Sequence, residues 1–141
     1  DLTGIEGFTS LTDLLIHWNQ LTSLDVSTNT ALTFLACGGN QLTSIDVSQN
    51  TALTFLDFNF NNLTSLNVST NTALTGLYCS NNQLTSLTLG TGIDLNNLTL
   101  GAQNNDASLV IHVGTSARVT LAQSLFTVAN LSISTGTTFA I

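Results

Sequence analysis

Residues 42–62 read LTSIDVSQNTALTFLDFNFNN, and this stretch decides how the rest of the chain is organised. The 21 residues before it, 21–41, read LTSLDVSTNTALTFLACGGNQ, and the 21 after it, 63–83, read LTSLNVSTNTALTGLYCSNNQ. One unit is therefore written three times without an insertion. A fixed period of roughly 20 to 50 residues is the signature of a solenoid, in which successive repeats stack as coils.

Each half of the unit alternates apolar and polar residues. In residues 34–38 the side chains of Leu35 and Cys37 share one side, and in residues 23–27 Leu24 and Val26 do the same. A period of two over a short stretch predicts a half-buried strand. We therefore expect two short strands in each coil, one on each wall, with the apolar sides meeting inside. Neighbouring coils should stack as parallel strands about 4.8 Å apart.

The apolar positions of the copies align into the pattern L-x-x-L-x-[LCF]-x-x-N-x-L, as in residues 32–42 and 53–63. This pattern resembles the leucine-rich repeat signature. The full 21-residue form, with LTSLDVS as its second half, is similar to the IRREKO-type repeats of bacterial proteins, including secreted proteins of Bacteroidetes. The resemblance covers about residues 5–104. It implies a leucine-rich repeat solenoid, a binding role for the first-strand wall, and a location outside the cell or on its surface.

An Asn recurs where the chain leaves the first strand of each coil, at Asn19, Asn40, Asn61 and Asn82. In leucine-rich repeat proteins this Asn is buried in the turn and bonds to the backbone of adjacent coils. The chemistry suits that role, because the amide offers two donors and an acceptor and buried backbone groups need partners. We expect these four residues to be structural.

The terminal coils depart from the repeat. Residues 1–20 form an atypical first coil, as expected where one face of a solenoid meets solvent. After the altered spacer GTGID (residues 90–94), a fifth coil is expected where Leu95, Leu98 and Leu100 restore the register, with Gln103 in the Asn position. The expected fold is thus mainly β. It is a solenoid of about five 21-residue coils over residues 1–104, with two parallel strand walls.

The period is lost in residues 105–141. Residues 108–113 (SLVIHV) alternate and predict a strand, whereas residues 117–126 (ARVTLAQSLF) fit either a short helix or an irregular strand. Residues 131–134 and 138–141 predict short strands. We interpret residues 105–141 as a C-terminal cap, part of the same structural unit, that covers an otherwise exposed sheet edge.

The composition excludes several kinds of partner. Charged residues make up 6% of the chain, and one Arg, no Lys and eight acids give a net charge of −7. Nucleic acid and anionic lipid both require a basic surface, so neither is expected as a ligand. No apolar run approaches the 18 or so residues of a membrane span, so no membrane insertion is expected. A flat wall with so few charges is compatible with self-association.

The two cysteines, Cys37 and Cys79, occupy the same inward position two coils apart. Stacking at strand spacing separates them by roughly 10 Å, which is too far for a disulfide. We expect both to be buried, small apolar side chains.

The outward positions of the first-strand wall vary from coil to coil and gather aromatic residues. Exposed aromatic clusters mark interaction surfaces, where rings supply contact area and polar side chains supply direction. Such a wall would suit a sugar or a protein loop. An alternative is that Phe34 and Phe55 merely stack on each other across adjacent strands. The candidate ligand-binding residues are Trp18, Phe34, Phe55, Asp57, Tyr78, His17, Asn59 and Phe60.

The second-strand wall carries uniform columns of Ser and Thr, interrupted by Asp25 and Asp46. Flat hydroxyl ladders resemble those of ice-binding β-solenoids, although the acidic column departs from the usual T-x-T. Two carboxylates are too few for the six to eight oxygen ligands, roughly, that Ca²⁺ takes. Hydrogen bonding within the ladders is the commoner explanation of such columns, and we expect no metal site.

Catalytic signals are weak throughout. His17 and His112 have no partner at a catalytic spacing, there is no Gly-rich phosphate loop, and the Ser residues sit in ladders rather than beside a base. We therefore expect no enzyme activity and no cofactor. The function we expect is a non-catalytic binding or adhesion module of a secreted or cell-surface bacterial protein, recognising a protein or a glycan. The alternatives are a structural spacer without a specific ligand, or ice binding.

Overall fold

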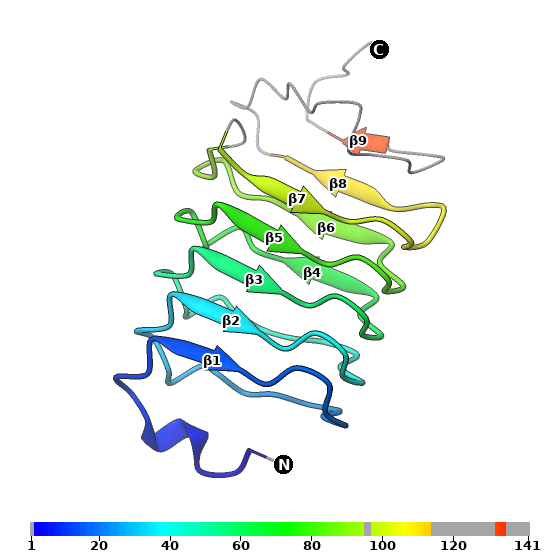
Figure 1. Cartoon of the computed structure of the whole chain (residues 1–141). Coiled ribbons are helices and arrows are strands. Elements are labelled where there is room, and N and C mark those ends of the chain that lie inside the picture. Colours follow the sequence, from blue (N-terminus) through cyan, green and yellow to red (C-terminus); the bar gives the residue numbers. More distant parts are fainter. Residues whose placement is uncertain (1, 95–96, 114–131, 135–141) are drawn as a thin grey trace.

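The computed structural model describes residues 2–94, 97–113 and 132–134. A short 3-10 helix, η1 (Ile5–Gly7), precedes a stack of coils along which three-residue strands repeat (Figure 1). Two parallel sheets run along the stack. The first holds β1 (Asp13–Leu15), β2 (Phe34–Ala36), β3 (Phe55–Asp57), β5 (Gly76–Tyr78) and β7 (Thr99–Gly101). The second holds β4 (Ser65–Asn67), β6 (Ser86–Thr88), β8 (Val110–His112) and β9 (Ser132–Ser134).

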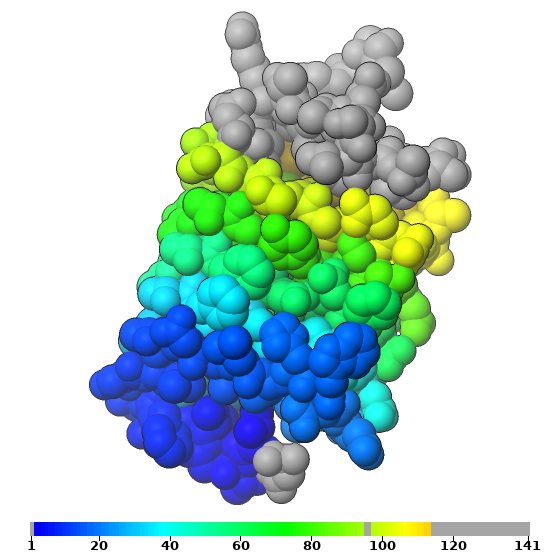
Figure 2. Space-filling view, in the orientation of Figure 1, coloured from blue at the N-terminus to red at the C-terminus, as the bar shows by residue number. Residues whose placement is uncertain are grey.

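The first sheet confirms the repeat register through its first four strands. Leu14, Leu35, Leu56 and Leu77 pair in sequence, and all four side chains are buried. Each coil alone could not bury this face, whereas stacked coils bury it continuously. The expected mainly β solenoid of about five coils is therefore confirmed, and its first-sheet wall forms one continuous face (Figure 2).

The fifth coil is shifted from the register that we predicted. Leu77 pairs with Leu100, 23 residues on, and the position of the ladder Asn is held by Asn105. The prediction that Leu98 and Leu100 restore a 21-residue register, with Gln103 in the Asn position, is wrong. Because strand side chains alternate with a period of two, a two-residue insertion leaves the apolar pattern unchanged and escapes detection. Leu95 lies outside the described residues.

The second wall forms strands only from the third copy onward. No strand forms at residues 23–27 or 44–48, where Leu24 and Ile45 are only half-buried. The expectation of two strands in every coil is therefore wrong for the first coils. Strand pairing requires coils at ladder spacing, about 4.8 Å, and the ladder hydrogen bonds of this wall begin with Thr85 N donating to Thr64 O.

The interior is a continuous apolar column. Cys37, Phe58 and Cys79 occupy the same inward position in three successive coils. Both thiols are free and buried, as expected. Burial raises the pKa of Cys79 to about 12. Burial, followed by the negative charge of Asp57, raises the pKa of Cys37 well above its usual range. Because the thiolate is the reactive form, both cysteines are inert packing residues.

The described residues beyond 104 continue the second sheet. The predicted strand in residues 108–113 is observed as β8, which pairs with β6, and the strand predicted at 131–134 is observed as β9. The other predicted elements, 117–126 and 138–141, lie outside the described residues, so the cap over 105–141 stays a prediction. Among the residues described, no helix is long and apolar enough to cross a membrane.

Candidate binding site on the first-strand wall

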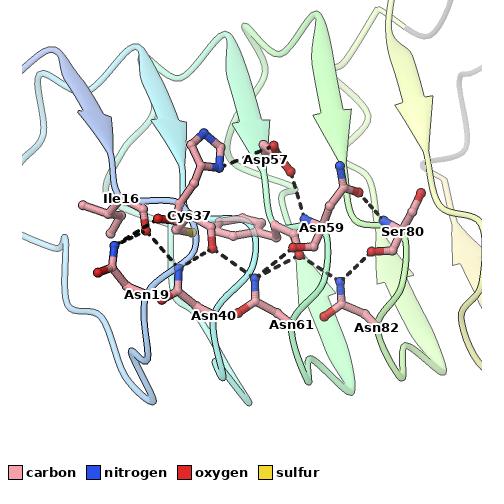
Figure 3. A network of polar contacts seen from close by, with 11 residues as sticks. Ile16, Asn19, Cys37, Asn40, Asp57, Asn59, Asn61, Ser80 and Asn82 are labelled. Atoms are coloured by element: carbon pink, nitrogen blue, oxygen red, sulfur yellow. Dashed lines mark hydrogen bonds and ion pairs between the residues drawn. The ribbon is translucent and has the colours of Figure 1, made fainter.

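A ladder of Asn side chains fixes the turn that follows each first-sheet strand (Figure 3). The Nδ2 group of Asn40 donates to the carbonyls of Cys37 (2.9 Å) and Ile16 (3.0 Å), and its Oδ1 accepts from Leu21 N (3.1 Å). Asn61 and Asn82 repeat this arrangement in the next coils. Each amide thus joins its own coil to the preceding one. Asn19, in the first coil, is exposed, and its hydrogen bonds to Ile16 O and His17 O stay within its own coil.

A second Asn ladder escaped sequence reasoning. Asn29, Asn50 and Asn71 are fully buried, and Asn50 Nδ2 donates to Val26 O and Asn29 O, both at 2.9 Å. The three Oδ1 atoms have no hydrogen-bond partner among the described residues. The signal was present in the sequence, because this Asn recurs in the NTAL segment of all three copies. It stabilises the turn that enters the next first-sheet strand.

The residue just before each ladder Asn adopts a left-handed backbone conformation. The φ values are 54° for Trp18, 70° for Gly39, 55° for Phe60, 56° for Asn81 and 55° for Asn104. Gly and Asn enter this region at little cost, whereas a bulky side chain there is an outlier. Three coils thus carry the residue that the turn favours, and two carry an aromatic residue that it disfavours.

Those two aromatic residues meet across the intervening coil. The rings of Trp18 and Phe60 lie 5.7 Å apart between centroids and are tilted by 35°. Trp18 is 74% exposed and Phe60 50% exposed. The coil between them contributes Gly39, and a Cβ there would overlap the Trp18 ring. The missing side chain of Gly39 is therefore what lets the ring of Trp18 lie over the middle coil.

A polar pair, His17 and Asp57, also spans the middle coil, at the residue before Gly39. His17 Nδ1 lies 3.9 Å from Asp57 Oδ2, and both side chains lie close to Gly38. A Cβ at Gly38 would lie 3.3 Å from Asp57 Oδ1 and 3.4 Å from His17 Nδ1, which leaves little room for a larger side chain. The other carboxylate oxygen is held in place, because Asp57 Oδ1 accepts from Asn59 N at 2.9 Å. Asn59 Oδ1 in turn accepts from the backbone N of the next coil, at 2.7 Å.

Together these side chains surround a recess of about 320 Å³ whose floor is the Gly38–Gly39 backbone. Coil one supplies one rim and coil three the other. The two glycines lie on the predicted wall but are not among the predicted site residues, although the GG pair occurs in only one of the three copies. The recess is lined by His17, Trp18, Gly38, Gly39, Asp57, Asn59 and Phe60.

The other three predicted site residues form a separate packing cluster on the strands themselves. Phe34 and Phe55 stack in parallel with centroids 4.4 Å apart, and Tyr78 tilts against Phe55 at 5.3 Å. All three are half-buried. Gly76 makes room for the stack, because a Cβ there would lie 2.9 Å from the Phe55 ring. The alternative interpretation, stacking of Phe34 on Phe55 across adjacent strands, describes this pair.

The polar side chains of the second-wall coils bond to their own backbone. Asp25 Oδ1 accepts from Ser27 N and Asp46 Oδ1 from Ser48 N, and these backbone hydrogen bonds hold the pKa of both carboxyls below its usual value. The hydroxyl of Thr54 donates to Thr33 O of the preceding coil. Within residues 2–94, 97–113 and 132–134, no group of three or more His, Cys, Asp or Glu side chains could hold a metal ion.

The stacked parallel strands and the Asn ladder define a solenoid of the leucine-rich repeat kind. One similar solved structure is described as the functional domain of InlJ from Listeria monocytogenes, which includes a cysteine ladder. The two chains share 33% identity with a TM-score of 0.56, over 78% of this chain and 26% of the other. This chain thus spans about a quarter of the InlJ chain. No protein-family model matches this chain, and a search of curated proteins finds no match.

Proposed function

We propose that this chain is a non-catalytic recognition module that binds a partner protein through the recess on the first-strand wall. One observation carries the proposal. Trp18 and Phe60 occupy a left-handed turn position that other coils fill with Gly39, Asn81 or Asn104, and both rings remain largely exposed. The leucine-rich repeat resemblance supports a parent protein that is secreted or displayed on a bacterial cell surface.

Backbone strain at an exposed aromatic residue favours a role in binding over a role in the scaffold. A non-Gly residue in the left-handed region costs on the order of 1 kcal/mol or more, and such strain gathers at functional sites. A scaffold that needed only a turn would use Gly or Asn, as it does at Gly39 and Asn81. Exposed Trp residues are also the side chains most often found at the energetic centre of protein interfaces.

The geometry supports a protein partner better than a glycan. A sugar needs several well-placed hydrogen-bonding groups beside a flat aromatic face. Here Asp57 Oδ1 and Asn59 Oδ1 already accept backbone hydrogen bonds. The rings of Trp18 and Phe60 are tilted by 35° and do not form one platform. The similarity to InlJ, a leucine-rich repeat protein, points to protein binding as well.

The test compares two sets of variants of the full chain. Trp18→Asn combined with Phe60→Asn removes both rings and keeps a residue that the turn favours. Asn81→Gly changes the same turn position outside the recess and serves as the control. Immobilised wild type and variants are exposed to extracellular proteins and to a panel of polysaccharides, and bound material is quantified.

We expect a protein partner whose binding falls at least about tenfold in the double variant and is unchanged in Asn81→Gly. Polysaccharide binding that is lost in the same double variant would replace the protein partner with a glycan. Equal binding by wild type and double variant would show that the recess is not the site. Absence of any ligand would favour the structural-spacer alternative and overturn the proposal.

A further inference from the structure

One end of the recess carries the carboxylate of Asp57, and one of its oxygens is available to a ligand. Asp57 Oδ2 lies 3.9 Å from His17 Nδ1, which is longer than a hydrogen bond. The carboxylate cannot rotate freely, because its other oxygen accepts from Asn59 N. Asp57 therefore presents an oriented oxygen that a stronger donor can take. His17 is the one basic side chain among the described residues that line the recess, and about a third of its side chain is exposed.

The aromatic end of the recess has the same electrostatic preference. The faces of Trp18 and Phe60 carry the negative part of the ring quadrupole, and a cation within about 6 Å of a ring centroid is attracted to it. Both rings are exposed on the rim. A side chain entering the recess would therefore meet a carboxylate and two aromatic rings. Trp gives the strongest interaction of this kind among the aromatic residues.

The floor of the recess offers little to an anion. The backbone N–H of Trp18 donates to Gly38 O, that of Gly39 to Asn59 O, and that of Phe60 to Ser80 O, at 2.9 to 3.0 Å. These donors are used to join the coils and are not available to a carboxylate or phosphate. An anionic ligand would thus face Asp57 without help from these backbone donors, at the cost of placing like charges together.

The chain as a whole has almost no cations of its own. It contains no Lys and a single Arg, Arg118, against eight acidic residues. Arg118 lies outside the described residues, and the described residues that line the recess include neither Lys nor Arg. A net charge of −7 attracts basic partners and repels acidic ones over the range of the Debye length.

We propose that the recess takes one positively charged side chain of the partner protein, an arginine or a lysine. The charged head pairs with Asp57, and the flanking methylene groups and cation lie against Trp18 and Phe60. A volume of about 320 Å³ is at the lower end of the range for ligand pockets and suits one long side chain. This inference rests on the proposed function and specifies what the recess recognises.

The experiment uses two short peptides that differ at one atom of the central side chain. One carries arginine between Gly and Ser residues, and the other carries citrulline, its neutral isostere. Each is titrated into the isotope-labelled full chain. The readout is the indole N–H resonance of Trp18, which is unambiguous because Trp18 is the only Trp. Lysine and norleucine peptides form a second matched pair.

We expect the arginine peptide to shift the Trp18 resonance with an affinity at least about tenfold above that of the citrulline peptide, and added salt to weaken it. Asp57→Asn keeps the size of the side chain and the acceptor for Asn59 N, and should remove the difference between the two peptides. An equal response to both peptides, or a response to neither, would overturn the assignment of a cation.

The two proposals fail separately. If Asp57→Asn leaves partner binding intact while Trp18→Asn with Phe60→Asn abolishes it, the recess binds a partner but does not recognise a cation. If a neutral sugar shifts the Trp18 resonance and the basic peptides do not, the ligand is a glycan. If none of these variants changes partner binding, both the proposed function and this inference are wrong.

Discussion

The interior of the solenoid and the recess on its first wall treat the repeat in opposite ways. In the interior, Leu35, Leu56 and Leu77 pair in register and are fully buried, and each coil contributes the same side chain. In the recess, the position just before the ladder Asn is occupied by Trp18 in one coil, Gly39 in the next and Phe60 in the third. Identical inward side chains let the coils stack. A glycine between two large outward side chains leaves a recess on the surface.

The turns of the Asn ladder and the turns of the recess also differ in how their backbone conformation is stabilised. The ladder residues adopt turns that their own amides stabilise, as Asn61 does through bonds to two coils. Trp18 and Phe60 adopt a conformation that their own side chains disfavour. The scaffold therefore tolerates strain at the recess because the adjacent Asn ladder determines the turn. Variants of the interior should lose stability, and variants of the recess should lose binding alone.

The largest effect is expected for Leu56→Asp. This change buries an unpaired carboxylate where the side chain contacts coils on both sides, at a cost of several kcal/mol in addition to the lost apolar burial. That is comparable to the whole stability of a domain, so the array should unfold. Circular dichroism and thermal melting measure it. Leu15→Asp, at a first-sheet position 61% exposed, is the control and should melt near wild type.

The two Asn ladders should differ in their cost of removal. Asn61→Ala removes four hydrogen bonds to backbone groups, and we expect a loss of about 2 to 4 kcal/mol. Asn50→Ala removes two, and its Oδ1 has no partner among the described residues, so its loss should be smaller by about 1 kcal/mol. Urea unfolding compares the two. A larger loss for Asn50→Ala would contradict this account of the ladders.

The recess aromatics should be replaceable without loss of stability. Asn in place of Trp18 or Phe60 relieves strain of about 1 kcal/mol at each site and loses a ring contact of similar size, so the midpoint should stay near wild type. Ala at the same sites relieves less strain and should be less stable than Asn by about 1 kcal/mol per site. If the Asn variants unfold early, the rings belong to the scaffold and the comparison fails.

The smallest expected effect is a dependence of stability on acid pH. The Ser27 and Ser48 backbone N–H groups lower the pKa of Asp25 and Asp46 from 3.8 in the folded protein. Their contribution is therefore present above pH 3.8 and is lost as the pH falls through the lowered values. Melting below pH 4 should respond less to pH in Asp25→Asn with Asp46→Asn. Asn67 already makes the same bond, at 3.0 Å, in the third copy.

Much of the scaffold could be predicted because every coil meets a near copy of itself. The spacing of Leu35, Leu56 and Leu77 correctly predicted which side chains are buried. The prediction failed where the backbone changes but the pattern of apolar residues does not. The two-residue insertion before Leu100 preserves the alternation of apolar residues. Residues 23–27 and 44–48 form no strand, although they carry the same apolar alternation as β4 does in the third copy.

The sequence predicted a set of site residues, but only the packing shows which of them lie together in the recess. Trp18, Asp57 and Phe60 were expected on one wall, together with Phe34 and Phe55. The repeat alone establishes a stack of coils with apolar columns inside, since each inward position is set by the copy 21 residues away. Which outward side chains meet depends on the size of the residue between them. Glycines in the middle coil let the rims approach, and the tertiary structure alone shows that contact.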